Sequence, residues 1–189
     1  GWGVGSPERT DVKNAQCLVL IGSHLGENMH NTQVQEFAEA IRNGATVITV
    51  DPRFSVAASK SDEWMPIKPG TDIALLLAWM NVIIGEGLHD RQYIEAYGYG
   101  FEQLEAHVQP YTPEWAYTRT GLDPDQIRRT ARMMAAARPA TLIHPGRHVT
   151  WYGKIVEQMA DAAPHRGSAR IESTPSDDTR ARSMRARLA

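Results

Sequence analysis

Short apolar runs alternate with longer stretches of mixed polarity along most of the chain. Three runs are apolar at consecutive positions and are bounded by turn residues, a pattern typical of strands buried on both faces. They cover residues 15–22, 45–50 and 140–144. A fourth run, at 64–67, is shorter. Because Pro66 cannot donate a ladder hydrogen bond, this run is predicted to lie at a sheet edge.

Apolar residues at helical spacing fill the segments between these runs. After the first strand, Val34, Phe37 and Ile41 predict a helix over 29–44 that ends at Gly44. Further helices are predicted over 71–87, 90–98, 100–108, 112–121 and 123–138. The order strand, helix, strand, helices, strand predicts an α/β fold with a parallel sheet and helices on both of its faces.

Several helix starts carry signals of their own. Thr112 and Asp123 each precede a proline, which is the arrangement expected of an N-cap followed by the first helical residue. Thr71 or Asp72 is predicted to cap the helix over 71–87. That helix is apolar nearly all round, so it is expected to be buried.

The composition is that of an ordinary globular protein, with 42% hydrophobic and 22% charged residues and a net charge of −2. This balance gives no argument for nucleic acid as a partner. The single cysteine, Cys17, excludes an internal disulfide and any all-cysteine metal site, and its apolar neighbours predict a buried, unreactive thiol. The longest apolar run, Ile73–Ile84, is too short to cross a bilayer, and residues 1–11 lack the pattern of a signal peptide.

Candidate chemistry gathers where the predicted strands end, because ligands of open parallel sheets bind beyond the carboxyl ends of the strands. In the first loop, Gly22 and Gly26 let a ligand approach the backbone, and the following helix offers free N–H groups. This loop is not a G-x-G-x-x-G motif, and a plain βα turn explains it equally well. No metal-ligand spacing, nucleophile elbow or P-loop is present in the sequence.

Two further loops end in acids. Asp51 closes the second strand, where an acid commonly binds a ribose, and Arg53 could pair with a phosphate. Asp51 follows Gly22 by 29 residues, more than the usual spacing of about 20. An Asp-Pro turn with an exposed arginine is the alternative. Asp72 presents two coplanar acceptors that suit the N–H edge of a guanine, although helix capping alone explains it.

Taken in order, the segments "LVLIGSHLGEN", "VITVDPRFSVAASKSDEWMPIKPGTD" and "ATLIHPGRHVTWYG" resemble the molybdopterin oxidoreductase family, that of dimethyl sulfoxide reductase and formate dehydrogenase. Within it, the chain is most similar to large subunits of thiosulfate, polysulfide or tetrathionate reductases. The resemblance runs from about Asp11 to Gly153 and implies a Rossmann-like domain. This domain would grip one guanosine half of a bis-molybdopterin guanine dinucleotide that carries molybdenum or tungsten.

The resemblance also implies a contact for each loop. The pyrophosphate loop matches Gly22, Ser23, His24, Glu27 and Asn28. The ribose and guanine are matched by Asp51 and Arg53, and the guanine edge by Gly70, Thr71 and Asp72. The loop that runs toward the pterin side matches Gly146, Arg147, His148 and Thr150, with Arg147 or His148 closest to metal or substrate.

The family's metal ligand and 4Fe-4S cysteines precede the matching region, so no residue of this chain is assigned as catalytic or metal-binding. The expected domains are 1–153 for the cofactor, 154–176 as an insertion or linker, and 177–189 as a basic helix fragment. We expect this part to be inactive alone, within a catalytic subunit that acts on a sulfur compound.

The resemblance further implies an iron–sulfur electron-transfer subunit and a membrane anchor subunit as partners, in a periplasmic or membrane-associated complex. Two alternatives remain open from the sequence. One is a stand-alone purine-nucleotide-binding or regulatory module that kept the fold without the chemistry. The other is a truncated, non-functional fragment, because residues 154–176 interrupt the expected join between "WYG" and "DDT".

Overall fold

A computed structural model describes residues 10–23, 25–27 and 31–145 of the chain. All of them belong to one compact unit. The predicted domain boundaries at 153 and 176 lie outside the described residues and stay predictions. In the part that the structure describes, no helix is long and apolar enough to cross a membrane.

The centre of the fold is a parallel sheet of four strands in the order β3-β2-β1-β4. The strands are β1 (Cys17–Ile21), β2 (Thr46–Val50), β3 (Glu63–Met65) and β4 (Thr141–Pro145). The predicted α/β fold with a parallel sheet is confirmed. β3 lies at an edge of the sheet as predicted, but it ends before Pro66, which has no N–H group to continue the ladder.

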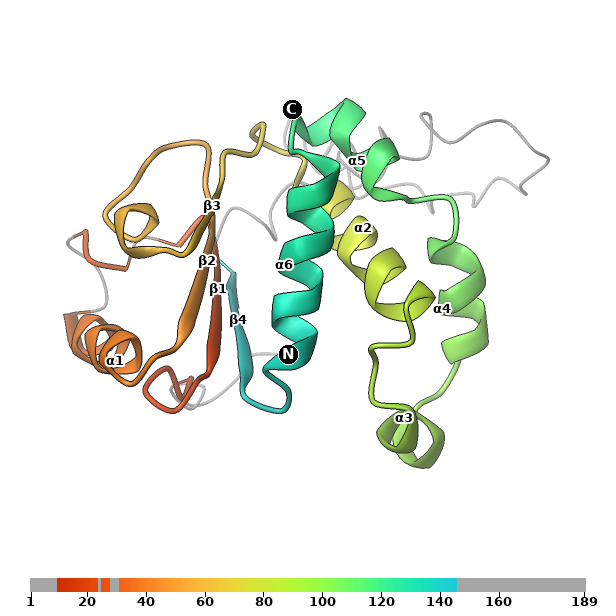
Figure 1. Ribbon diagram of the computed structural model, residues 1–189, viewed down its shortest axis with the longest axis horizontal. Helices are drawn as coiled ribbons and strands as arrows, with labels where there is room; N and C mark the ends of the chain where they lie inside the picture. The colour runs from red at the N-terminus through yellow and green to blue at the C-terminus, as the bar shows by residue number, and fades with distance from the viewer. Residues whose placement is uncertain (1–9, 24, 28–30, 146–189) are drawn as a thin grey trace, which may run out of the picture. The chain divides into compact units, whose positions relative to one another are not determined.

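Helices cover both faces of the sheet (Figure 1). One face packs against α1 (Asn31–Arg42), and the other against α2 (Asp72–Gly85) and α6 (Pro124–Ala136). β1 serves both cores, because alternate side chains of a strand point to opposite faces. Leu18 and Leu20 pack with α1, while Val19 and Ile21 pack with α2 and α6, and all four are almost fully buried.

Four shorter elements complete the described chain. They are η1 (Ala58–Lys60), α3 (Arg91–Tyr97), α4 (Phe101–Val108) and α5 (Pro113–Thr120). The predicted N-caps of α5 and α6 are confirmed: Thr112 accepts a hydrogen bond from the Trp115 amide, and Asp123 accepts one from the Gln126 amide. α2 is buried as predicted, and Trp79 on it donates a hydrogen bond of 2.9 Å to the Thr130 hydroxyl of α6.

Candidate functional site

Three of the predicted binding loops lie at the same edge of the sheet. β3, β2 and β1 are neighbours and run parallel, so their carboxyl ends meet at one edge. The Gly22 amide donates to the Val50 carbonyl at 2.9 Å, and the Asp51 amide donates to the Met65 carbonyl at 3.2 Å. These bonds continue the ladder past the strand ends and fix where each loop begins.

The first loop presents open backbone at its start. Gly22 has φ +57°, and a Cβ atom placed on it would meet no atom of the described residues within 4 Å. Ser23 next to it is buried, with 5% of its surface exposed. Gly26 is different, because a Cβ there would lie 3.1 Å from Cγ1 of Val56. The loop is therefore open at Gly22 and tightly packed against the second loop at Gly26.

Glu27 joins the first loop to the second. Its Oε2 atom lies 2.5 Å from Nη2 of Arg53, and its Oε1 atom accepts a hydrogen bond of 3.0 Å from the Val56 amide. The hydrogen bond that Arg53 donates to Glu27 raises the pKa of Arg53. The side chain of Arg53 is still 58% exposed, so the guanidinium remains accessible to an anion. Sequence patterns gave no signal for this pair.

Asp51 organises the second loop. The residue is 5% exposed, and its Oδ1 atom accepts a hydrogen bond of 2.8 Å from the Arg53 amide, which forms an Asx turn. Its backbone carbonyl accepts a hydrogen bond of 2.9 Å from the indole of Trp64, and that indole packs edge-on against Phe54. The alternative interpretation as an Asp-Pro turn is therefore correct as a description of the structure. A carboxylate has two oxygens, so this turn does not exclude a ligand on the other one.

The third loop differs in one respect from its sequence prediction. Thr71 occupies the N-cap position of α2, but its hydroxyl donates to the Lys68 carbonyl at 2.7 Å and makes no capping bond to the helix. Of the two residues predicted as the N-cap, Thr71 is therefore the one that occupies the position, but its hydroxyl closes the preceding turn at Gly70, which has φ +80°. Asp72 is then the first residue of α2, and burial raises the pKa of its carboxyl group.

The remaining predicted contacts cannot be placed. His24, Asn28, Gly146, Arg147, His148 and Thr150 lie outside the described residues. β4 ends at Pro145 beside the end of β1, since Ile21 and Pro145 are paired in register. β4 therefore ends at the same edge of the sheet at which the other three loops begin.

Cys17 is a structural residue, as predicted. It lies in β1 with 0% exposure, and burial raises the pKa of its thiol to about 11, with a smaller contribution from Asp62. A thiol that stays protonated at neutral pH is a poor metal ligand. The described part of the chain contains no group of three or more His, Cys, Asp or Glu side chains that could hold a metal ion.

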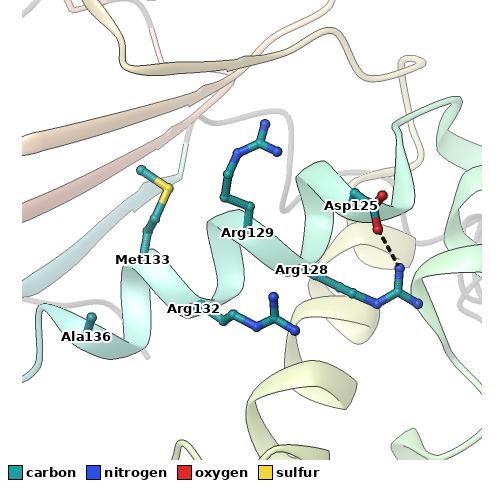
Figure 2. Close-up of a pocket in the computed structure, with 6 residues that line it drawn as sticks. All are labelled: Asp125, Arg128, Arg129, Arg132, Met133 and Ala136. Atoms are coloured by element: carbon teal, nitrogen blue, oxygen red, sulfur yellow. Dashed lines mark hydrogen bonds and ion pairs between the residues drawn. The ribbon is translucent and has the colours of Figure 1, made fainter.

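A hollow of about 540 Å³ lies on α6 and was not predicted (Figure 2). It is lined by Asp125, Arg128, Arg129, Arg132, Met133 and Ala136. Each of its three guanidinium groups is paired with an acid outside α6: Arg128 with Glu114, Arg129 with Glu63 and Arg132 with Glu86. These pairs fasten α6 to its neighbours and neutralise the hollow, so it is not a candidate anion site.

The family of the chain is settled by comparison with known proteins. The model of the molybdopterin oxidoreductase family matches residues 3–164. The chain belongs to this family. The resemblance recognised in the sequence is thereby confirmed, and membership implies a molybdopterin cofactor for the protein.

Similar curated proteins come from several branches of the family. The thiosulfate reductase molybdopterin-containing subunit PhsA of Salmonella typhimurium is 38% identical over 148 residues, which are 78% of this chain and 20% of that protein. The dimethyl sulfoxide reductase DmsA of Escherichia coli is 32% identical, with 78% of this chain and 21% of that protein covered. Because these relatives are reductases, the family to which the chain belongs is a family of enzymes.

The fold also has a counterpart among solved structures. Acetylene hydratase from Pelobacter acetylenicus matches with a TM-score of 0.70 and 35% sequence identity, over 74% of this chain and 19% of that one. The chain thus spans about a fifth of the length of the relatives that it matches.

The described residues suit a cofactor that carries phosphate and nucleoside groups. Gly22 offers open backbone and Arg53 an exposed cation at the carboxyl edge of the sheet. Asp51, which is buried, and Asp72, which is partly buried, supply acceptors that suit the hydroxyl and N–H donors of a nucleoside. A nucleotide site needs donors for the phosphates and acceptors for the nucleoside, and both are present in these loops.

Proposed function

We propose that this part of the protein holds the guanosine half of a bis-molybdopterin guanine dinucleotide. The observation that supports the proposal is the meeting of three polar loops at one edge of the sheet, beyond the ends of β1, β2 and β3. Residues separated by up to 50 positions, Gly22 to Asp72, share this edge because the strands are parallel and adjacent. Ligands of open α/β sheets bind at this position.

Each loop has a role in this proposal. The Gly22 backbone and Arg53 bind the diphosphate, because free amides and a guanidinium both complement its charge. Asp51 accepts hydrogen bonds from the ribose through the oxygen that does not close its own turn. Asp72 accepts two hydrogen bonds from the N1 and N2 donors of guanine. We further assign Ser23, His24, Asn28, Gly70, Thr71, Gly146 and Thr150 to the surroundings of the cofactor, and Arg147 and His148 to its pterin side.

The bound molybdenum or tungsten centre supplies the redox chemistry, and the protein's part is to bind and orient the cofactor. We propose that the ligand of the metal and the cysteines of a 4Fe-4S cluster belong to a preceding part of the complete subunit. The residues described here would then show no turnover alone. An iron–sulfur subunit and a membrane anchor subunit are the partners proposed for the complete enzyme.

A sulfur compound is the proposed substrate class of the complete enzyme. Thiosulfate and dimethyl sulfoxide appear in the names of two relatives, and both substrates contain sulfur that can be reduced. The name of acetylene hydratase shows that this fold also occurs with a different reaction, so the fold alone does not select the substrate. A panel of sulfur oxyanions and sulfoxides, tested on the complete subunit, decides the point.

Calorimetry with nucleotides tests the guanosine site on the chain itself. GDP should bind more tightly than ADP, because guanine presents N–H donors on two adjacent nitrogens, N1 and N2, whereas N1 of adenine is an acceptor. The Asp72→Asn variant should reduce this preference by about tenfold or more, since an amide offers one acceptor where two are needed. Asp125→Asn, at an exposed position of α6, is the matched control and should bind as the unchanged chain does. Equal binding of GDP and ADP by the unchanged chain would disprove the guanine assignment.

The same substitution can be tested in a complete enzyme. With Asp72→Ala in the full catalytic subunit, cofactor occupancy should fall, as measured by the molybdenum and guanine content of the purified protein. Asp125→Ala should leave both contents unchanged. Full occupancy in the Asp72→Ala subunit would count against a role for Asp72 in holding the cofactor.

A further inference from the structure

Glu27 contacts the second loop with both of its carboxylate oxygens. Oε2 pairs with the guanidinium of Arg53 at 2.5 Å, and Oε1 accepts the amide of Val56 at 3.0 Å. One side chain of the first loop thus spans residues 53–56 of the second loop. Next to it, Val56 lies where a Cβ of Gly26 would be 3.1 Å away, so the two loops are closely packed at this point.

Arg53 is consequently held at both ends. Its backbone amide donates to Oδ1 of Asp51 at 2.8 Å, and its guanidinium is held by Glu27. The pair with Glu27 employs one of the five N–H groups of a guanidinium, and the side chain is 58% exposed. An arginine held in this way can donate to an anion without first losing its rotamer freedom, which otherwise weakens binding.

We infer that Glu27 is a positioning residue, which acts on a bound diphosphate through Arg53 and does not contact the ligand itself. The inference rests on the proposed nucleotide site at this edge. A carboxylate beside a diphosphate would repel it, whereas a carboxylate that holds a guanidinium in place favours its binding. This assigns Glu27 a different role from the direct contact implied by the family resemblance.

Glu27→Gln is the informative variant, because it keeps the shape of the side chain and removes one acceptor oxygen and the charge. A single amide oxygen can serve the Val56 amide or Arg53, but it cannot hold both as the carboxylate does. Glu27→Asp is the second variant. It keeps the negative charge but is one methylene shorter, so it separates the effect of reach from the effect of charge.

The experiment measures binding of GDP and of guanosine by calorimetry at physiological ionic strength. Glu27→Gln should weaken GDP binding roughly two- to tenfold, the range expected for losing one pre-ordered side chain. Guanosine lacks the diphosphate, so its affinity should not change. Glu27→Asp should weaken GDP binding in the same sense. In the Arg53→Ala background, Glu27→Gln should cause no further loss.

Three results would overturn the inference while leaving the proposed guanosine site intact. These are tighter GDP binding by Glu27→Gln, an equal loss for guanosine, or an equal loss in the Arg53→Ala background. The first would show that Glu27 only repels the ligand, the second that it only supports the loop, and the third that it binds the ligand directly. Failure of the unchanged chain to prefer GDP over ADP would instead disprove the site itself, and the inference with it.

Discussion

Burial makes ionisation of Asp72 unfavourable, whereas its proposed role in binding guanine requires the ionised carboxylate. Burial raises the pKa of its carboxyl group, so the ionised form is less favourable there than in water. The proposed ligand offers N–H donors, which would stabilise the ionised form again. A carboxylate whose ionised form is unfavourable until a ligand supplies hydrogen-bond donors is typical of a binding site.

The free-energy cost of ionising the Asp72 carboxyl group should be measurable as a lower stability of the folded chain. Asp72→Asn removes the charge and is expected to unfold at the same or a higher temperature than the unchanged chain at pH 7, measured by circular dichroism. A carboxyl group with a raised folded pKa destabilises the fold increasingly as pH rises above its unfolded value, about 3.9 for aspartate. The difference should therefore vanish below about pH 3.9. A lower unfolding temperature for Asp72→Asn at pH 7 would contradict this expectation.

Gly26 tests how tightly the first two loops are packed. It has φ +94°, where any side chain is strained, and a Cβ would lie 3.1 Å from Val56. Gly44 has a similar φ of +87°, but a Cβ there meets no described atom within 4 Å. Gly44→Ala should cost about 1–2 kcal/mol from backbone strain alone. Gly26→Ala should cost measurably more in urea denaturation, and equal losses would show that Val56 moves away freely.

Among the elements, α6 depends on partners from several parts of the chain. Arg129 forms two hydrogen bonds to Glu63 of β3, at 2.5 and 3.1 Å, and Gln126 donates to the same carboxylate at 2.9 Å. The hydrogen bonds from Arg129, followed by the one from Gln126, lower the pKa of Glu63 despite its partial burial. These contacts hold α6 against the edge strand of the sheet.

Lowering the pH should weaken the contact between Glu63 and α6 over a predictable pH range. A carboxyl group with a lowered folded pKa stabilises the fold above its unfolded pKa, about 4.3, and this stabilisation is lost as pH falls through the folded value. At pH 7, Glu63→Gln should lower the free energy of unfolding by about 1 kcal/mol. The difference should shrink below about pH 4.3. Glu86→Gln, at the more exposed pair with Arg132, is the control and should cost less.

The contact between α2 and α6 contains one buried polar pair. Trp79 donates to the hydroxyl of Thr130 at 2.9 Å, and both residues are almost fully buried. Thr130→Val keeps the shape but leaves the indole N–H without an acceptor, which should cost about 1–3 kcal/mol in urea denaturation. Thr118→Val, on the exposed face of α5, is the control and should have little effect. Comparable losses in the two variants would show that the indole finds another acceptor.

At the scale of the whole molecule, β4 is the least buried of the four strands of the sheet. Ile143 of β4 is 48% exposed, although its register partner in β1, Val19, is fully buried. Edge strands of soluble proteins usually carry a charge or other protection, and Thr141–Pro145 carries no lysine or acid. Because the chain spans about a fifth of its relatives, we expect a surface of this kind to be covered in a longer protein.

Self-association of the chain should depend on this edge. We expect the unchanged chain to form larger species at high concentration, measured by sedimentation velocity, because the edge can pair with another strand. Ile143→Lys should reduce this association. Tyr99→Lys, at a fully exposed residue outside the sheet, should not. A monomeric unchanged chain at all concentrations would show that the edge is already protected.

Much of the fold could be predicted from the sequence because it depends on neighbouring residues. The apolar runs around Leu18 and Ile48 identified buried parallel strands, and prolines 113 and 124 identified helix starts. The three loops could also be chosen, since strand ends in such sheets are known places for ligands. Thr71 was correctly among the predicted N-cap residues, but the partner of its hydroxyl could not be predicted, because local pattern does not separate a bond to the helix from one to the preceding turn.

The sequence by itself determined the elements, their parallel arrangement and the family. Tertiary structure alone decided which polar groups meet. Glu27 and Arg53 are 26 residues apart, and Glu63 and Arg129 are 66 apart, with no periodicity that relates them. The burial that raises the pKa of Asp72 likewise depends on how the chain is packed around α2. Local preference follows from the residues next to each position, whereas these contacts follow from the order of strands in the sheet.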